Sequence, residues 1–172
     1  MWQILNQKNR GFTIIELLIS LFVLVIGILA AYSVAQLPIS YTSVSVNQLT
    51  AAYLAQEGIE IVRNIRDTNW LTPDNNWDDG LESGDYEADY ASTGLVLLSC
   101  SPSCGYNDLS FLKIDSNGFY NKDTGTDTKF KRKITLTPTS DFLTVSVTVF
   151  WKDKGKQDPY QFTVQENLYN WK

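Results

Sequence analysis

Apolar residues concentrate near the start of the chain, where polar residues are almost absent. Residues 17–32 read LLISLFVLVIGILAAY, and weaker apolar character extends this stretch to residues 12–37. A helix over residues 12–37 would be roughly 39 Å long, whereas the hydrocarbon core of a bilayer is roughly 30 Å thick. The pattern therefore predicts a membrane-spanning helix.

A second helical pattern follows the apolar stretch. Pro38 and the β-branched and polar residues after it predict that the helix is interrupted or kinked there. Apolar and small residues then recur at i, i+3 and i+4 spacing, at Ala51, Leu54, Ala55, Gly58, Ile61, Val62 and Ile65. This spacing predicts an amphipathic helical continuation over residues 38–66. The small residues Ala55 and Gly58 would let a sheet of the same chain approach the helix closely.

The hydrophobic period changes to two in the last part of the chain. Alternation is clear in residues 86–90, 130–136, 143–151 and 160–168, and a shorter pair lies at residues 111–114 and 119–120. Such alternation is typical of half-buried antiparallel strands. Residues 67–172 are thus predicted to form a β-rich globular region. The fold class that follows is α+β, with one long N-terminal helix packed on an antiparallel sheet.

The basic residues predict the direction of insertion. Lys8 and Arg10 precede the apolar stretch, and no basic residue occurs again until Arg63. The positive-inside rule therefore places Met1 in the cytoplasm and the chain after Tyr41 outside. The chain is expected in the inner membrane as a single-pass protein.

A cleaved secretory signal peptide is an alternative for the same stretch. Ala30, Ala31 and Ala35 offer small residues of the kind that signal peptidase requires. Glu16 argues against this interpretation, because neither a signal peptide nor a plain anchor has a use for a carboxylate at the start of the apolar segment. A carboxylate there needs a partner.

Composition removes several classes of function. The chain has 14 basic and 19 acidic residues, a net charge of -5 and no histidine. Without histidine the Ser-His, Cys-His and zinc hydrolase mechanisms are excluded. No run of lysine or arginine is dense enough to follow a nucleic acid backbone, so direct nucleic acid binding is not expected. We expect no catalytic residues and no cofactor.

The segment KNRGFTIIELL at residues 8–18 carries a specific motif. It combines a basic leader, Gly11, Phe12 and an acid at Glu16, followed directly by the apolar span. This combination resembles the processing site of type IV pilins and of the pseudopilins of type II secretion systems. The resemblance implies that residues 1–11 are a leader, that prepilin peptidase cuts between Gly11 and Phe12, and that the new amine of Phe12 is methylated.

The resemblance also implies a role for Glu16 in assembly. In the family, this acid pairs with the N-terminal amine of a neighbouring subunit and so sets the register. A helix beginning at Phe12 would also put Glu16 on the same face one turn later. The implied partners are other pilin or pseudopilin subunits and, indirectly, the assembly platform and ATPase of the inner membrane. The alternative is an uncleaved anchor whose Glu16 reaches the headgroups.

Cys100 and Cys104 lie in the segment SCSPSCG. Because the predicted orientation places them outside the cytoplasm, we expect a disulfide that closes this small loop, worth about 2 kcal/mol at most. A redox-active pair normally has two residues between its cysteines. Major pilins often have cysteines that bracket a long C-terminal region and a kink proline earlier than Pro38. The chain therefore resembles a minor pilin or pseudopilin.

Acidic residues accumulate between residues 70 and 89 without a basic residue among them. A calcium loop is one interpretation, with candidate ligands Asp74, Asn76, Asp78 and Glu82. The match to an EF-hand fails at Asp79, which occupies the place of the turn glycine, and at Asp85, which occupies the place of the bidentate glutamate. A solvated acidic loop is the simpler prediction.

Two rival functions remain from the sequence. An uncleaved, anchored binding or adhesion module would need a basic groove or an aromatic platform, and the one basic stretch, residues 129–133, is interpreted as the exposed face and edge of a strand. An exported enzyme with paired carboxylates would need an apolar setting that the acidic segment lacks. The favoured function is a structural subunit of a pilus or secretion filament.

Overall fold

A computed structural model describes residues 11–90, 94–153 and 155–170, and for residues 36–41 the backbone alone. The chain divides into two compact units, residues 1–45 and residues 46–172. One helix, α1 (Ile14–Leu71), belongs to both. The leader predicted for residues 1–11, with Lys8 and Arg10, lies outside the described residues except for Gly11.

The first unit consists of the first half of α1. From Gly11 to Ala35 every residue is exposed. The segment Ile14–Ala35 has a mean hydropathy of 2.9 and is long and apolar enough to cross a membrane. The predicted span is confirmed in its length and composition.

The sequence predicts an interruption or a kink at Pro38. The interruption is wrong, because α1 runs from Ile14 to Leu71 without a break. A proline inside a helix removes one backbone donor and crowds the preceding turn, which bends many helices without ending them, so the kink stays a prediction. The helix also extends five residues past the predicted limit of 66, and the turn-rich acidic segment begins only after Leu71.

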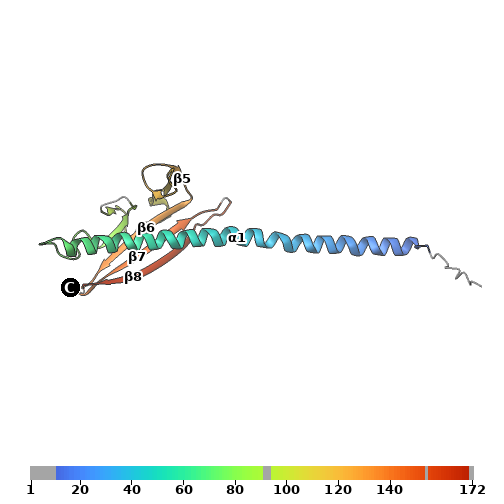
Figure 1. Cartoon of the computed structure of the whole chain (residues 1–172), viewed down its shortest axis with the longest axis horizontal. Coiled ribbons are helices and arrows are strands. Elements are labelled where there is room, and N and C mark those ends of the chain that lie inside the picture. The colour runs from blue at the N-terminus through green and yellow to red at the C-terminus, as the bar shows by residue number, and fades with distance from the viewer. Residues whose placement is uncertain (1–10, 91–93, 154, 171–172) are drawn as a thin grey trace, which may run out of the picture. The chain divides into compact units, whose positions relative to one another are not determined.

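The second unit contains a five-stranded antiparallel sheet in the order β2-β1-β6-β7-β8. Figure 1 labels three of its strands, β6, β7 and β8. Its strands are β1 (Gly84–Glu87), β2 (Val96–Leu97), β6 (Phe130–Pro138), β7 (Phe142–Trp151) and β8 (Tyr160–Tyr169). The strands predicted from period-two alternation are confirmed. The two-residue β2 is too short to produce a pattern and was not predicted.

Residues 98–129, between β2 and β6, form a smaller substructure that we call the excursion. It contains a 3-10 helix, η1 (Tyr106–Asp108), and a three-stranded sheet in the order β4-β3-β5. These strands are β3 (Lys113–Ile114), β4 (Tyr120–Asn121) and β5 (Thr126–Asp127). The predicted short pair corresponds to β3 and β4, whereas β5 was not predicted.

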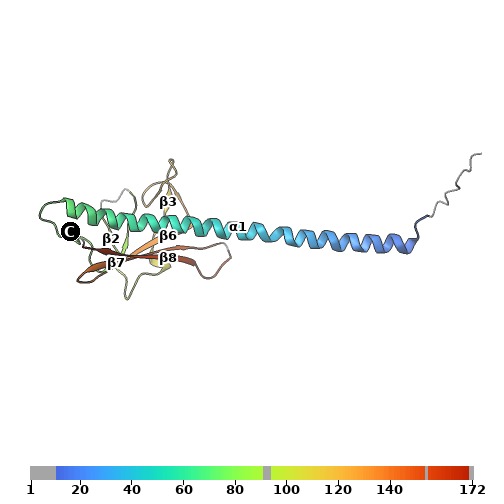
Figure 2. The same ribbon diagram turned by 60° about the horizontal axis from the view of Figure 1, so that its bottom comes forward.

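The second half of α1 packs on the sheet within the second unit (Figures 1 and 2). The core joins one row of the helix to the alternate residues of the strands, among them Ala51, Leu54, Ala55, Val62, Ile134, Val145, Val147 and Val149. Contact is closest at Gly58, where an added Cβ would lie 2.8 Å from Val147 Cγ1. The α+β class and the role of small helix residues are therefore confirmed.

Candidate functional site

The first candidate site is the start of α1. The hydroxyl of Thr13 accepts a hydrogen bond from the backbone N–H of Glu16 at 3.3 Å, and the Thr13 carbonyl accepts one from Leu17 at 3.1 Å. Threonine three residues before glutamate is the spacing of a capping box. The helix therefore begins at Ile14, and Phe12 lies outside it. The structure is that of the uncut chain, so a helix that begins at Phe12 after cleavage stays a prediction.

Glu16 lies in the first turn of α1 with its side chain exposed. The positive end of the helix dipole favours a carboxylate at this position. Within the described residues no lysine or arginine pairs with it. The structure therefore places Gly11, Phe12 and Glu16 at the start of α1, with the Glu16 carboxylate exposed.

The surface of this half of α1 is apolar all round. Large apolar side chains from Phe12 to Val34 are exposed, and none of the 18-residue window within Ile14–Ala35 that defines the span is buried in the chain itself. A helix that is apolar on all sides is stable only in lipid or among other helices. Membrane anchoring is consistent with this surface.

Arg132 fastens the second half of α1 to the sheet. It is 2% exposed, and its guanidinium donates to the carbonyls of Leu54 at 2.9 Å and Ala88 at 2.7 Å. Its Nη1 also lies 3.1 Å from Glu57 Oε2. Burial lowers the pKa of Arg132, and Glu57 opposes that shift. The guanidinium is held in the core by hydrogen bonds from both layers.

Residues 129–133 were predicted to be an exposed basic stretch, and this prediction is wrong for Lys131 and Arg132, which are buried. Lys131 is buried, with Nζ 4.3 Å from the ring centroids of both Tyr106 and Phe111. Burial lowers the pKa of Lys131, although the nearby acids Glu87 and Asp108 oppose this. Because Arg132 faces the helix and Lys131 faces the excursion, the two do not form a basic surface.

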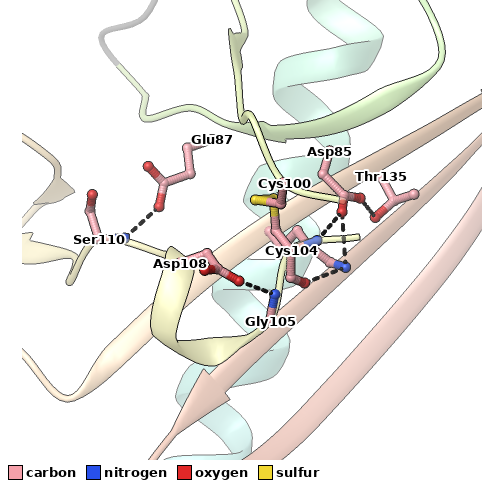
Figure 3. Close-up of a disulfide and its surroundings, with 9 residues drawn as sticks. Asp85, Glu87, Cys100, Cys104, Gly105, Asp108, Ser110 and Thr135 are labelled. Carbon is pink, nitrogen blue, oxygen red and sulfur yellow. Dashed lines mark hydrogen bonds and ion pairs between the residues drawn. A yellow bond between two sulfur atoms is a disulfide. The ribbon is translucent and has the colours of Figure 1, made fainter. Parts of the chain in front are cut away.

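The end of the predicted solvated acidic loop is also corrected. Glu87 and Asp89 are buried, and the side chain of Asp85 is 9% exposed. Glu87 accepts a hydrogen bond from the Ser110 backbone at 2.7 Å (Figure 3). It accepts another from Lys122 Nζ, also at 2.7 Å. Asp89 accepts one from the Lys122 backbone at 3.1 Å. These acids are buried because they fix the excursion to the sheet.

Asp85 is the central acceptor beside the disulfide (Figure 3). It accepts hydrogen bonds from Thr135 Oγ1 at 2.6 Å and from the Cys104 backbone at 2.7 Å, and Lys133 Nζ lies 3.4 Å away. Burial alone would raise the pKa of Asp85. The hydrogen bonds and Lys133 outweigh it, so the pKa lies below its usual value.

Cys100 and Cys104 form the predicted disulfide. Cys104 packs with Leu109 and Phe150 in a small second core on the side of the sheet away from α1. Lys133 Nζ also donates to the Cys104 carbonyl at 3.0 Å. The disulfide therefore joins a half-buried Cys100 to a buried Cys104, and its loop is hydrogen-bonded to the sheet.

The calcium candidates do not assemble into a cation site. Among the residues described, no group of three or more Asp, Glu, His or Cys side chains is arranged to hold a metal ion. Asp79 instead accepts hydrogen bonds from the backbone and side chain of Asn76 at 2.9 and 3.3 Å. Asp74, Asp78 and Glu82 are thus not brought together by the fold.

Two features of the site were not predicted. One is the cap at Thr13, although the spacing of threonine and Glu16 carries its signal. The other is the pairing of Arg63 with Glu166 of β8, at 2.7 Å between Nη2 and Oε2. Nothing in the sequence near Arg63 indicates a partner 103 residues away.

An apolar, exposed N-terminal helix continued into a helix-on-sheet unit defines a pilin-like α+β protein. Residues 6–32 match the family model described as the prokaryotic N-terminal methylation motif. The match supports assignment of the chain to the type IV pilin and pseudopilin family, as a pilin-type subunit of a filament. The motif also implies processing by prepilin peptidase and assembly with other pilins. No curated protein and no solved structure matches the chain.

Proposed function

We propose that the chain is a minor pilin or pseudopilin of a type IV pilus or a type II secretion-like filament. It is cut after Gly11, methylated on Phe12 and held in the inner membrane with its globular unit outside the cytoplasm. It then leaves the membrane by assembling into a filament through the first half of α1. The role is structural, and no catalytic step is assigned to it.

The observation that carries the proposal is the exposed apolar helix that begins directly after the cleavage motif. A helix of this kind needs lipid before assembly and neighbouring helices afterwards. Cleavage after Gly11 would put an ammonium at Phe12, next to the capped first turn. In a medium of low dielectric, a carboxylate such as Glu16 gains most from an ammonium of a neighbouring subunit.

The proposal of a minor subunit rests on the globular unit. The disulfide of the globular unit joins two cysteines that are four positions apart in the sequence. It therefore constrains little of the C-terminal region. The distribution of cysteines typical of major pilins is absent from the sequence. A subunit present in few copies would need its distinctive surface in the globular unit.

Processing and assembly are tested together in cells that contain prepilin peptidase and a filament machine. Mass spectrometry of the mature chain should give an N-terminus at methylated Phe12. Glu16→Gln should be processed normally and incorporated into filaments about tenfold less, because glutamine keeps the helix cap but not the charge. Ser20→Ala, one turn further along α1, is the matched control. An intact Met1, or unchanged incorporation of Glu16→Gln, would contradict the proposal.

A further inference from the structure

The last strand of the sheet has a free edge. β8 pairs with β7 over ten consecutive residues from Tyr160 to Tyr169 and stands at the end of the strand order. Among the described residues no strand pairs with its other side. Its backbone donors and acceptors on that side therefore point outward as a template for another strand.

This edge has few of the features by which proteins normally protect an edge strand. The segment YQFTVQENLY contains no proline and no lysine, and Glu166 is its one charged residue. Its pairing with β7 keeps one register throughout, so no bulge twists the edge away. The opposite edge of the sheet is β2, which has only two residues. The short β2 offers few backbone groups to an added strand, whereas the ten-residue β8 offers many.

A groove lies between the free edge and α1. It has a volume of about 600 Å³, and its walls include Tyr53, Gln56, Glu60 and Arg63 from α1 and Val164 and Glu166 from β8. Tyr53 is 64% exposed, and Val164 is half-buried although it faces the helix. An added strand would place alternate side chains in this groove and complete the burial of Val164.

The charges in the groove select the side chains that fit. Three carboxylates line it: Glu60 and Glu166 both pair with Arg63, and Glu57 pairs with Arg132. Two guanidinium groups thus face three carboxylates, which leaves one carboxylate in excess. The apolar wall is formed by Tyr53 and Val164. An incoming strand with apolar side chains and one lysine or arginine on its groove-facing row complements both.

A second copy of the chain fits the edge poorly. Two β8 strands that pair edge to edge and antiparallel are related by a twofold axis normal to the sheet. Such an axis reverses one copy relative to the other in the plane of the sheet. Val46, where the chain enters the globular unit, would then lie at one end of the dimer in one copy and at the other end in its partner. Both copies must come from one membrane, so a different protein is favoured. This step rests on the proposed anchoring of α1.

We propose that the free edge of β8 binds an extended segment of another extracytoplasmic protein by strand addition. The segment carries a groove-facing row of apolar side chains with a central basic residue. The backbone of residues 160–169 supplies the hydrogen bonds, and the groove beside α1 supplies the selectivity. This would give a filament subunit a docking site that is independent of its assembly helix.

The test uses the full chain in detergent micelles and two synthetic ten-residue peptides with blocked ends. In both, one row of alternate side chains is threonine and the other is valine. The centre of the valine row is lysine in one peptide and glutamate in the other. The lysine peptide should slow amide exchange in residues 160–169 and bind about tenfold more tightly than the glutamate peptide, because like charges face each other in the latter.

Variants on the two faces of one strand provide the control. Val164→Lys places a charge in the groove and should weaken binding of the lysine peptide about tenfold, whereas Gln165→Lys, on the opposite face, should change it less than about twofold. If Val164→Lys does not fold, Tyr53→Ser on the exposed helix wall should also weaken binding. Equal affinity for the two peptides, unchanged exchange in β8, or dimers of the chain formed through β8 would each overturn the proposal. The peptide-binding experiment needs no filament, so its failure can be told apart from a failure of the Glu16→Gln assembly test.

Discussion

The two halves of α1 belong to one helix but have different surroundings. From Gly11 to Ala35 no described side chain is buried. From residue 46 onward one row of the helix, including Ala51, Ala55 and Val62, is buried completely. The two surroundings follow from the distribution of apolar side chains. The first half is apolar on every side, whereas the second half is apolar on one side only.

The comparison shows which half depends on the chain's own fold. The second half packs on the sheet through its buried row, whereas no described side chain of the first half, from Gly11 to Ala35, is buried. Substitutions in the first half should therefore act on membrane insertion and assembly, and those in the second on folding. The glycines of the two halves test this division directly.

Gly58→Leu should have the largest effect on folding. Its Cβ would lie 2.8 Å from Val147 Cγ1 and 3.3 Å from Arg132 Cδ, in a part of the core that cannot move freely. Overpacking of this kind costs about 1–3 kcal/mol, and leucine adds a whole side chain here, so we expect a loss of about 3 kcal/mol. Urea unfolding of the full chain in micelles, followed by tryptophan fluorescence, should show this loss as a lower midpoint.

Gly27→Leu is the matched control, because no atom lies within 4 Å of a Cβ added there. It should leave the unfolding midpoint of the globular unit unchanged. A loss similar to that of Gly58→Leu would mean that the first half also packs on the chain's own fold. Absence of any loss in Gly58→Leu would mean that helix and sheet can separate at little cost.

Local patterns predicted most of this architecture. Alternation at residues 143–151 specified β7, and helical spacing from Ala51 to Ile65 specified the buried row of α1. The combination of Gly11, Phe12 and Glu16 indicated the family before any fold was known. These features could be predicted because each depends on residues close together in the sequence.

Features that depend on distant partners were not predicted. The acids Glu87 and Asp89 belong to a segment with the composition of a solvated loop, and they are buried only because Ser110 and Lys122 fold back onto them. Pro38 was predicted to interrupt or kink the helix, and α1 continues through it. Helix formation is cooperative, so one unfavourable residue does not have to end a long helix.

Arg132→Met should have the second largest effect on folding. The variant keeps much of the side-chain volume but removes the donors to Leu54 and Ala88 and the partner of Glu57. The cost should be about 2 kcal/mol, because the carbonyls stay buried while Glu57 is partly exposed to water. Lys129→Met removes the more exposed pair with Asp153 and should cost less than about 1 kcal/mol. If the two variants were equally stable, Arg132 would not be the link between helix and sheet.

Asp85→Asn should lower the free energy of unfolding least, by about 1 kcal/mol at neutral pH. This loss should depend on pH. The pKa of Asp85 is lower in the folded chain than its ordinary value, so the carboxylate stabilises the fold above that ordinary value of about 3.9. This contribution is lost as the pH falls through the lower folded pKa. The difference in unfolding free energy between the natural chain and Asp85→Asn should therefore narrow from pH 7 to pH 3. A gap that widens in acid would show that the disulfide loop is not held by the ionised Asp85.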